Sequence, residues 1–492
     1  MSQQITRKGF LKGALAGAAG IAAASMLGGC STESPKTADS ESIETLESAD
    51  ILIIGGGMAG FIAGIHAMEL GNKNVLIIDK ASGEGFNWAG SSMVCGGSLL
   101  IPVSGSEADA KAYADALYVK ALQKSNYDHL TTLANGAWES YQWLLELGIQ
   151  YGEPYSVFPA FPEVRTTVSS MGDTMTRLRD KYTEMNGRLL FNTKAVQLMY
   201  GGNGISGALV RQDDHYAQIK AKKTILCTGG YAANKEFLET HVGENGDEIM
   251  CRAREGCTGD GIAMAQAVGG YTVNSCGMRS IHLSAVDPVY KEKGQPGNDI
   301  PYMIAVNSEG RRFVDEALGS VRHGQAVFNQ PVQKDGLIFD SKVLETVQAT
   351  MDKLKGQGVI TWKADTIEEM AGYFGVDAAA LIQTVEEFNS HVTAEGTTEG
   401  LAVNKSAKAL KIDTPPYYGI YPLVPGTSLT FGGLAISTNA EVLEPDGGVI
   451  QNLYACGEGT GGFFYDDYFG GSCLTRCAVY GRIAAKTAVE SL

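Results

Sequence analysis

The chain is 492 residues long, has a net charge of −16 and a pI near 5.0, and contains 62 glycines and nine cysteines. A chain of this length is too long to fold around a single hydrophobic core, so two domains or a large insertion are expected. The acidic balance leaves no basic surface to spare for phosphate backbones, which argues against nucleic acid as a partner.

Residues 1–30 have the pattern of an export signal. A short basic region precedes an apolar run over residues 14–27, which is short for a bilayer-spanning helix. The tetrapeptide ending at Cys30 resembles a bacterial lipobox, so we expect a lipid on Cys30 to anchor the exported protein to the outer face of the cytoplasmic membrane. The segment around Arg7 and Lys8 also resembles a twin-arginine signal, but with a lysine in place of the second arginine. Export as a folded protein and export as an unfolded chain both remain open.

Residues 31–48 are rich in serine, threonine, glutamate and aspartate and contain almost no large apolar side chain. Such a composition cannot bury enough apolar surface to fold, so we expect a flexible tether. The tether would hold the folded part of the chain away from the membrane.

The clearest motif is a dinucleotide-binding pattern. Four consecutive aliphatic residues at 51–54 fit a strand buried on both faces. A GxGxxG pattern follows at once, with its glycines at Gly55, Gly57 and Gly60. These glycines allow a tight turn, close approach of a pyrophosphate to the backbone, and close packing of the next helix on the strand. A second apolar strand ends about 20 residues later at Asp79, where a carboxylate meets the ribose hydroxyls.

A glycine- and serine-rich loop at 83–92 follows the second strand. Its Gly90 and Ser91 are suited to offer N–H and O–H donors to a phosphate or a ring edge. A simple surface loop is the alternative. Next, tyrosine, leucine and tryptophan recur at three- and four-residue spacing over 108–147, which predicts packing helices.

Two further glycine-rich turns follow strand-like or helical segments. A strand ends in Thr228-Gly229-Gly230, and Thr258-Gly259-Asp260-Gly261 opens a helix. From about residue 278 charge increases and buried strands become fewer, and a helical stretch covers 365–392, which indicates an inserted domain. Glycine signals resume at 432–433, a last strand leads into Glu458, and Gly470-Gly471 precedes the closing helix.

In this order, the motifs resemble those of the soluble fumarate reductase family of flavoproteins, which also contains ketosteroid and tricarballylate dehydrogenases. The GxGxxG pattern, the turns at 228–230 and 258–261, the segment 310–316 and the tail 453–471 carry the resemblance. It implies an α/β fold with a Rossmann-like FAD-binding domain and an inserted α+β capping domain. The expected boundaries are 49–277 and 431–492 for the FAD-binding domain and 278–430 for the capping domain.

The resemblance also implies how FAD is held. Binding is expected to be noncovalent, because no histidine lies near Ser91, where relatives attach the cofactor covalently. The closing helix would direct its positive end toward the negative charge of a reduced flavin. The implied FAD contacts are Gly55, Gly57, Gly60, Asp79, Gly90, Ser91, Asp260, Glu458, Cys473 and Leu474.

In this family hydride passes between flavin N5 and a carbon–carbon bond next to a carbonyl or carboxyl group, and an acid exchanges a proton with the neighbouring carbon. The resemblance places His282 among the substrate residues, with a structural histidine as the alternative. It gives Arg322 the role of proton donor, two residues later than in fumarate reductases. An ion pair with Asp315 or Glu316 is the alternative for Arg322.

The residues that hold a dicarboxylate in fumarate reductases are replaced here. Leu429 stands where they keep a histidine, and Tyr468 stands where they keep an arginine. The surrounding aromatic run 463–469 is suited either to a larger, flatter substrate or to core packing. A phenol can also protonate a substrate, so Tyr468 is a second candidate for the acid. We expect a small unsaturated carbonyl or carboxylate substrate, with fumarate a weak substrate at best.

The nine cysteines form no haem-attachment or iron–sulfur motif. The sequence therefore predicts a separate cytochrome or quinol-linked electron donor for an extracytoplasmic reductase. A dehydrogenase that runs in the oxidative direction and an electron-transfer subunit without a small substrate are the alternatives. Cys251 with Cys257, or Cys473 with Cys477, would be placed for a disulfide, although free thiols are favoured for the helical pair.

Overall fold

The computed structural model describes residues 43–84, 88, 90–156, 158, 160–273, 281–286, 292–294 and 296–492. The export signal, Cys30 and most of the tether lie outside these residues, so the interpretations of them remain predictions. Leu46–Leu492 form one compact unit. Within the described part of the chain, no helix has the length and apolar character needed to cross a membrane.

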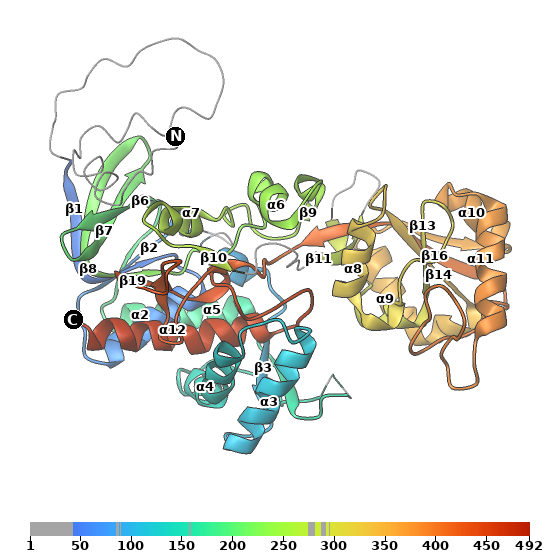
Figure 1. Ribbon diagram of the computed structural model, residues 1–492, viewed down its shortest axis with the longest axis horizontal. Coiled ribbons are helices and arrows are strands. Elements are labelled where there is room, and N and C mark those ends of the chain that lie inside the picture. The colour runs from blue at the N-terminus through green and yellow to red at the C-terminus, as the bar shows by residue number, and fades with distance from the viewer. Residues whose placement is uncertain are drawn as a thin grey trace, which may run out of the picture. The chain divides into compact units, whose positions relative to one another are not determined.

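The larger of the two main sheets contains the predicted nucleotide-binding strands (Figure 1). Its strands lie in the order β18-β19-β8-β1-β2-β5, and β7 pairs with β8 and with β6. The pairs β1/β2, β2/β5 and β8/β19 are parallel, as the α/β prediction requires, and the predicted class is confirmed. The strands are β1 (Thr45–Ile54), β2 (Val75–Ile78), β5 (Arg188–Leu190), β6 (Lys194–Gly201), β7 (Gly204–Gln212), β8 (His215–Leu226), β18 (Glu441–Leu443) and β19 (Val449–Ala455).

The centre of this sheet forms because two aliphatic runs pair side by side. Ile51 pairs with Val75 and Ile54 with Ile78, and every residue of both runs is at most 5% exposed. Strands buried on both faces need such continuous apolar runs, since neither face meets water. The covering helices are α2 (Met58–Glu69), α5 (Met171–Glu184) and α12 (Ser472–Glu490), with α2 in contact with both others.

β1 begins earlier than the sequence indicates. Its first residues belong to the stretch 31–48 that was predicted as a tether, and this boundary is corrected by the structure. The reason is a charged neighbour: Arg188 of β5 donates 2.8 Å to the Glu47 carboxylate and 2.7 Å to the Ser48 carbonyl. Polar composition conceals these contacts, because they are made by Arg188 of β5, a strand that pairs with β2 and not with β1.

Two helices, α3 (Glu107–Lys120) and α4 (Tyr127–Glu146), form where helical periodicity was expected. The helical stretch near the end of the predicted insertion is likewise two helices, α10 (Ile367–Phe374) and α11 (Ala378–His391). The remaining helices are α6 (Lys235–Val242), α7 (Asp260–Ala267), α8 (Ser320–Phe328) and α9 (Ser341–Gly356). Two small two-stranded sheets pair β3 (Ser98–Pro102) with β4 (Val164–Val168) and β10 (Thr272–Val273) with β17 (Gly433–Leu434). The short 3-10 helices are η3 (Gly90–Met93), η4 (Gly246–Glu248), η5 (Gly297–Tyr302), η6 (Glu316–Leu318) and η7 (Gly457–Gly459).

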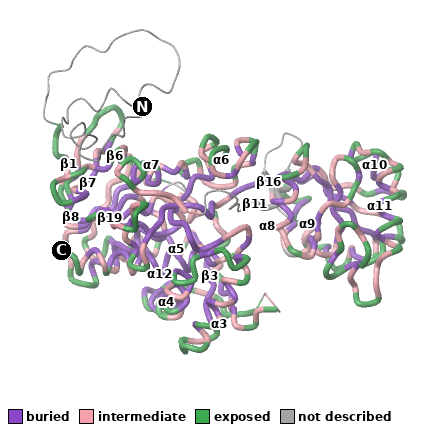
Figure 2. Tube along the Cα trace, viewed as in Figure 1, coloured by how far each residue is buried: buried purple, intermediate pink, exposed green. Residues whose placement is uncertain are grey.

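The second sheet is organised around its longest strand, β16, and is covered on both faces. In β14, Leu337 and Phe339 join a cluster with α9, whereas Ile338 joins a cluster with α10 and α11. The alternation follows from the two-residue period of a strand. Figure 2 shows β16 as a largely buried trace, and every residue of β14 is buried. The sheet contains β9 (Met250–Cys251), β11 (Ile281–Val286), β12 (Glu292–Gly294), β13 (Ile304–Asn307), β14 (Asp335–Asp340), β15 (Thr361–Ala364) and β16 (Tyr417–Thr427).

β9 joins this sheet although it precedes the expected insertion. Met250 pairs in parallel with Gly426 of β16, and Cys251 pairs with Thr427. The second sheet therefore includes one short strand from residues 49–277, which were predicted to belong to the FAD-binding domain. The predicted limits of the capping domain, residues 278 and 430, remain predictions.

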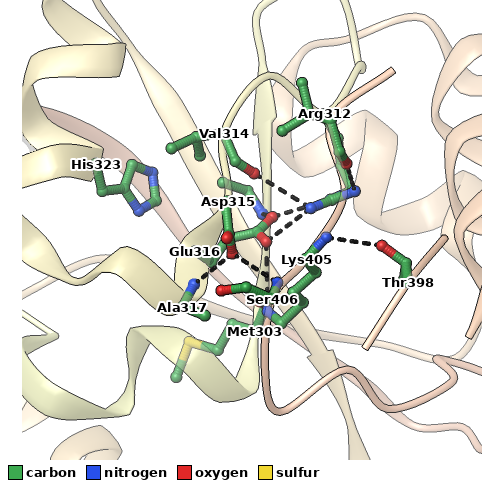
Figure 3. Close-up of polar contacts among 12 residues, drawn as sticks. Met303, Arg312, Val314, Asp315, Glu316, Ala317, His323, Thr398, Lys405 and Ser406 are labelled. Carbon is green, nitrogen blue, oxygen red and sulfur yellow. Dashed lines mark hydrogen bonds and ion pairs between the residues drawn. The ribbon is translucent and has the colours of Figure 1, made fainter. Parts of the chain in front are cut away.

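A buried ion cluster joins several loops beside the second sheet (Figure 3). The Glu316 carboxylate accepts bonds of 3.0 and 2.8 Å from Arg312 and lies 3.4 Å from Lys405 Nζ. The Ala305 N–H donates to the same carboxylate at 2.8 Å. Burial alone would raise the pKa of Glu316, but Lys405 and Arg312 outweigh it and lower that pKa. One carboxylate is thus the shared ion-pair partner of two buried cations.

Glu316→Ala should lower the free energy of unfolding by about 3–5 kcal/mol, because it leaves Arg312 and Lys405 buried without their anion. Urea denaturation followed by circular dichroism measures this, with exposed Glu309→Ala as the matched control. Because the pKa of Glu316 is lowered on folding, its contribution is present above the unfolded-state pKa and is lost as pH falls through the folded-state pKa. Equal stability of the two variants would contradict this role.

Candidate functional site

The turn after β1 has room only for glycine at two of its predicted positions. A Cβ at Gly55, where φ is +112°, would lie 2.3 Å from the Cys227 carbonyl oxygen. A Cβ at Gly60 would lie 1.9 Å from the Gly55 carbonyl oxygen. Both obstacles are backbone atoms, which cannot move aside as a flexible side chain can. At these two positions the backbones of β1, β8 and α2 therefore lie too close together for any residue with a side chain.

The N-terminus of α2 is suited to bind an anion. Gly57 is its N-cap and provides no side-chain cap, and the first turn contains no acidic residue. The positive end of the helix is therefore available to a phosphate. Ser92, which sequence reasoning missed, accepts a 3.1 Å hydrogen bond from the Met58 N–H at this terminus.

The predicted Ser91 has a different environment from its neighbour. Its hydroxyl lies 2.9 Å from Cys257 Sγ and accepts a 3.3 Å bond from the Arg254 N–H. Gly90, the other predicted contact in this loop, opens η3 with a φ of +54° and has free space around its Cα. The loop thus lies beside the start of α2, but Ser92 and not Ser91 contacts that helix.

Asp79 ends β2 and reaches back to the glycine turn. One carboxylate oxygen accepts a 2.7 Å bond from the Gly56 N–H, and the other accepts a 2.8 Å bond from the Ala81 N–H. Burial raises the pKa of Asp79, and these two bonds oppose the shift. Each oxygen keeps acceptor capacity for a hydroxyl, so the position fits a ribose diol.

Asp260 is held by cations of the protein itself. Its carboxylate lies 2.8 Å from Lys80 Nζ and 3.5 Å from Lys194 Nζ, and it accepts a 3.0 Å bond from the Thr258 hydroxyl. Although burial would raise the pKa of Asp260, Lys80 lowers it. The structure therefore shows Asp260 joining the segment after β2 to the start of α7. Its contact with FAD remains a prediction.

Three distant stretches meet at Glu458. A Cβ on Gly230 would lie 2.2 Å from Thr430 Oγ1 and 2.3 Å from Glu458 Oε1, and the Thr430 N–H donates 3.0 Å to Glu458. Burial, reinforced by nearby Cys473, raises the pKa of Glu458 to about 7. Thr430 Oγ1 is buried and has no hydrogen-bond partner. An unpaired buried hydroxyl indicates that a polar group belongs beside it.

Cys473 and Leu474 lie in the first turn of α12. The N-cap of this helix, Gly471, has a φ of +102° and gives no side-chain cap. The start of α2, whose N-cap Gly57 gives no side-chain cap, the close glycine turn and the Thr430 hydroxyl add to this terminus. Together they form the donor set that a flavin dinucleotide requires. The residues present therefore fit FAD.

Arg322 and Tyr468 are brought toward one another through Asp467. Gln325 of α8, the helix that carries Arg322, donates a hydrogen bond to the Asp466 carbonyl. Asp467 lies 2.8 Å from Lys120, accepts a 2.8 Å bond from the Tyr468 N–H and is close enough to Arg322 for that charge to lower its pKa. Burial is the larger effect and raises the pKa of Asp467 overall. The alternative ion pair of Arg322 with Asp315 or Glu316 is not formed.

Most of the aromatic run is core and not substrate wall. Phe463, Phe464 and Phe469 are at most 2% exposed. Tyr468 is only partly buried and packs edge-on against Phe431, with ring centroids 5.1 Å apart. Tyr468, like half-buried Tyr465 in the same run, therefore remains accessible for chemistry.

His282 and Leu429 are placed less completely. The backbone of His282 lies in β11, opposite Gly426 of β16, but its side chain falls outside the described part of the structure. Its role stays a prediction. Leu429 follows β16 and packs against the main hydrophobic core. The cysteines expected as possible pairs, Cys251 with Cys257 and Cys473 with Cys477, are all free thiols.

Comparison with known proteins gives a consistent set of similarities. Residues 50–473 match the family model described as FAD binding domain. The chain is 28% identical to an NADH:acrylate oxidoreductase of Vibrio harveyi, covering 94% of this chain but only 52% of that protein. It is 27% identical to a probable fumarate reductase of Shewanella frigidimarina (90% and 75% covered) and 28% identical to a urocanate reductase of Eggerthella lenta (89% and 74% covered).

A solved structure shows the same fold. The open conformation of a flavocytochrome c3 fumarate reductase is similar with a TM-score of 0.73 and 26% identity, covering 91% of this chain and 79% of that chain. The predicted resemblance to fumarate reductase-like flavoproteins and the prediction of FAD as cofactor are thereby confirmed.

Gly60→Ala should abolish FAD binding, because the added carbon would lie 1.9 Å from the Gly55 carbonyl oxygen and would force α2 away from the turn. Absorbance near 450 nm relative to 280 nm of the purified protein measures cofactor content. Gly172→Ala in α5 is the matched control, because a Cβ there meets nothing within 4 Å. A fully yellow Gly60→Ala protein would show that this close approach is not needed for the cofactor.

Proposed function

This chain belongs to the FAD-binding domain family and is an FAD-dependent oxidoreductase, and we propose that it reduces a carbon–carbon double bond next to a carbonyl or carboxyl group. Relatives that are similar over about nine tenths of the chain are reductases of fumarate and urocanate, which supports this reaction class. The observation that carries the proposal is the approach of Arg322 to the segment that bears Tyr468.

The residues of this site have separate roles in the proposed reaction. When bound, FAD supplies two-electron transfer to an activated double bond. Arg322 and Tyr468 are the two candidates to give a proton to the neighbouring carbon. Lys120 pairs with Asp467 and so limits the negative charge beside them. On this proposal one of them protonates the carbon next to the one that receives the hydride, on a substrate bound beside α8 and the segment 463–469.

The substrate carries at most one carboxylate on this proposal. Burying a carboxylate without a charged or hydrogen-bonding partner costs several kcal/mol. Leu429 offers no such partner, and Tyr468 offers a neutral phenol in place of a cation. The chain should therefore prefer monocarboxylate enoates or enones, and fumarate should be a weak substrate.

The electron donor and the location form part of the same proposal. Similarity to a protein named fumarate reductase (cytochrome) of Shewanella frigidimarina, 27% identical over 90% of this chain and 77% of that protein, supports a cytochrome or quinol-linked donor. We propose that this donor is a separate protein. The lipobox-like Cys30 supports attachment to the outer face of the cytoplasmic membrane.

Reoxidation of the reduced enzyme tests the function directly. FAD-loaded protein is reduced with viologen and mixed with a panel of enoates, enones, aryl-acrylates and fumarate. Rapid reoxidation by a member of the first three groups, and slow reoxidation by fumarate, supports the proposal. Reoxidation by a cytochrome alone would indicate an electron-transfer subunit, and activity only with a saturated compound plus a dye would indicate a dehydrogenase.

Tyr468→Phe and Arg322→Ala should keep FAD but reduce turnover with the best substrate, because each removes a candidate acid. Loss of a positioned general acid costs about a hundredfold to ten-thousandfold in rate, and the larger loss identifies the donor. Half-buried Tyr465→Phe in the same segment and exposed Arg311→Ala are the matched controls. Full activity of both test variants would return Tyr468 and Arg322 to structural roles.

Cys30→Ala should abolish labelling by a fatty-acid probe and leave the protein as a precursor or in released form, because the lipid-bearing thiol is gone. Labelling of cells that express each form, followed by fractionation, measures this. Labelling of the variant equal to that of the parent would show that Cys30 is not the lipid site.

A further inference from the structure

Arg476 of α12 is fully buried, yet among the described residues no carboxylate pairs with it. Its guanidinium donates 2.8 Å to the Thr460 carbonyl and 3.3 Å to Cys473 Sγ, while Nε has no partner. The rings of Phe463 and Phe464 lie 5.1 and 4.9 Å from it. Within the described residues, no aspartate or glutamate lies at ion-pair distance from Arg476.

A buried arginine needs a compensating anion, because guanidinium does not lose its proton in proteins. Two groups qualify by position. Glu458 acts on Arg476 only through space, and burial together with nearby Cys473 raises its pKa to about 7, so near neutral pH it carries only part of a negative charge. Cys473 touches the guanidinium directly. The direct partner is therefore the group expected to carry the negative charge.

The position of Cys473 in α12 favours the same state. It is the second residue of a helix whose N-cap, Gly471, supplies no side chain, so the positive end of the helix faces the sulfur. Cys477, one turn further, hydrogen-bonds to Cys473 and is itself buried. Together with Arg476, this bond lowers the pKa of Cys473 to about 6 against the opposing effect of burial. Cys473 itself is only partly buried.

We propose that Cys473 is a thiolate paired with Arg476 and is a covalent modification site for small electrophiles of the activated-alkene class, at the end of α12 where the cofactor binds. The sulfur adds to the β-carbon of the alkene, the π electrons move to the α-carbon, and that carbon takes a proton from water. The product is a thioether, and the step needs neither an oxidant nor a reductant. It does not depend on the proposed reductase activity.

The test is alkylation of the full-length chain by acrylamide, a neutral activated alkene, after FAD has been removed and rebinding of FAD has been verified. Site-resolved mass spectrometry gives a rate for each cysteine from pH 5 to 9.5. Cys95 is the internal control, because it is also partly buried but lacks a cation, and burial raises its pKa to about 11. At pH 7, Cys473 should react at least about tenfold faster than Cys95, with a rate midpoint near pH 6.

Two further measurements separate this role from simple accessibility. Arg476→Lys keeps the positive charge, so the rate midpoint of Cys473 should stay below that of an ordinary thiol. Arg476→Gln removes the charge and should raise the midpoint. If Arg476→Gln fails to fold, the pH dependence of Cys473 alkylation in the parent protein decides. Rebound FAD should slow Cys473 at least about tenfold while exposed Cys251 is unchanged. Any one of three results would overturn the proposal. The first is a rate midpoint for Cys473 at or above about 8.5, the ordinary thiol pKa. The others are a Cys473 rate no faster than that of Cys95 and the absence of protection by FAD.

Discussion

The close approach of α2 to the end of β1 is the constraint on which the rest of the site depends. With the Gly55 carbonyl oxygen only 1.9 Å from where a Cβ of residue 60 would lie, helix and strand meet backbone to backbone. Cys227 at the end of β8 closes the same turn from the other side. The carboxyl ends of β1, β2, β8 and β19 consequently face one region, which is where an open α/β sheet binds its ligand. Asp79 and Glu458 reach that region because each follows one of these strands.

Two buried cationic sites show different ways of satisfying charge. Beside the second sheet, the Glu316 carboxylate is shared by Arg312 and Lys405, and the cluster joins the loops that carry these residues. At α12, the described groups in contact with the Arg476 guanidinium are the Thr460 carbonyl, Cys473 and two aromatic rings. The first arrangement is complete within the protein. The second leaves a polar nitrogen unpaired in the region expected to receive FAD, as a site prepared for a ligand would.

The elements whose signal lies in their own residues were predictable. Aliphatic runs gave the central strands, and the glycine spacing gave the turn that the structure shows at Gly55 and Gly60. The start of β1 was not predictable, because Arg188 of another strand stabilises it. Ser92 and Lys80 were missed for a similar reason, since their contacts with Met58 and Asp260 depend on tertiary folding. The aromatic run 463–469 could be assigned either to a substrate wall or to the core until burial was known.

The orientation of Arg322 depends on contacts made by its neighbours in α8. His323, which is fully buried, lies 2.6 Å from the buried Asp335 of β14 and fixes the helix to the second sheet. Two residues further, Gln325 fixes the other side of the helix to the Asp466 carbonyl. The position of Arg322, near enough to Asp467 to lower the pKa of that carboxyl group, therefore depends on both attachments. Arg322 and Gln325 are three residues apart on α8 and so share one face of the helix, the face that contacts the segment bearing Tyr468. The geometry that would place an acid on the substrate is therefore set by α8 as a whole.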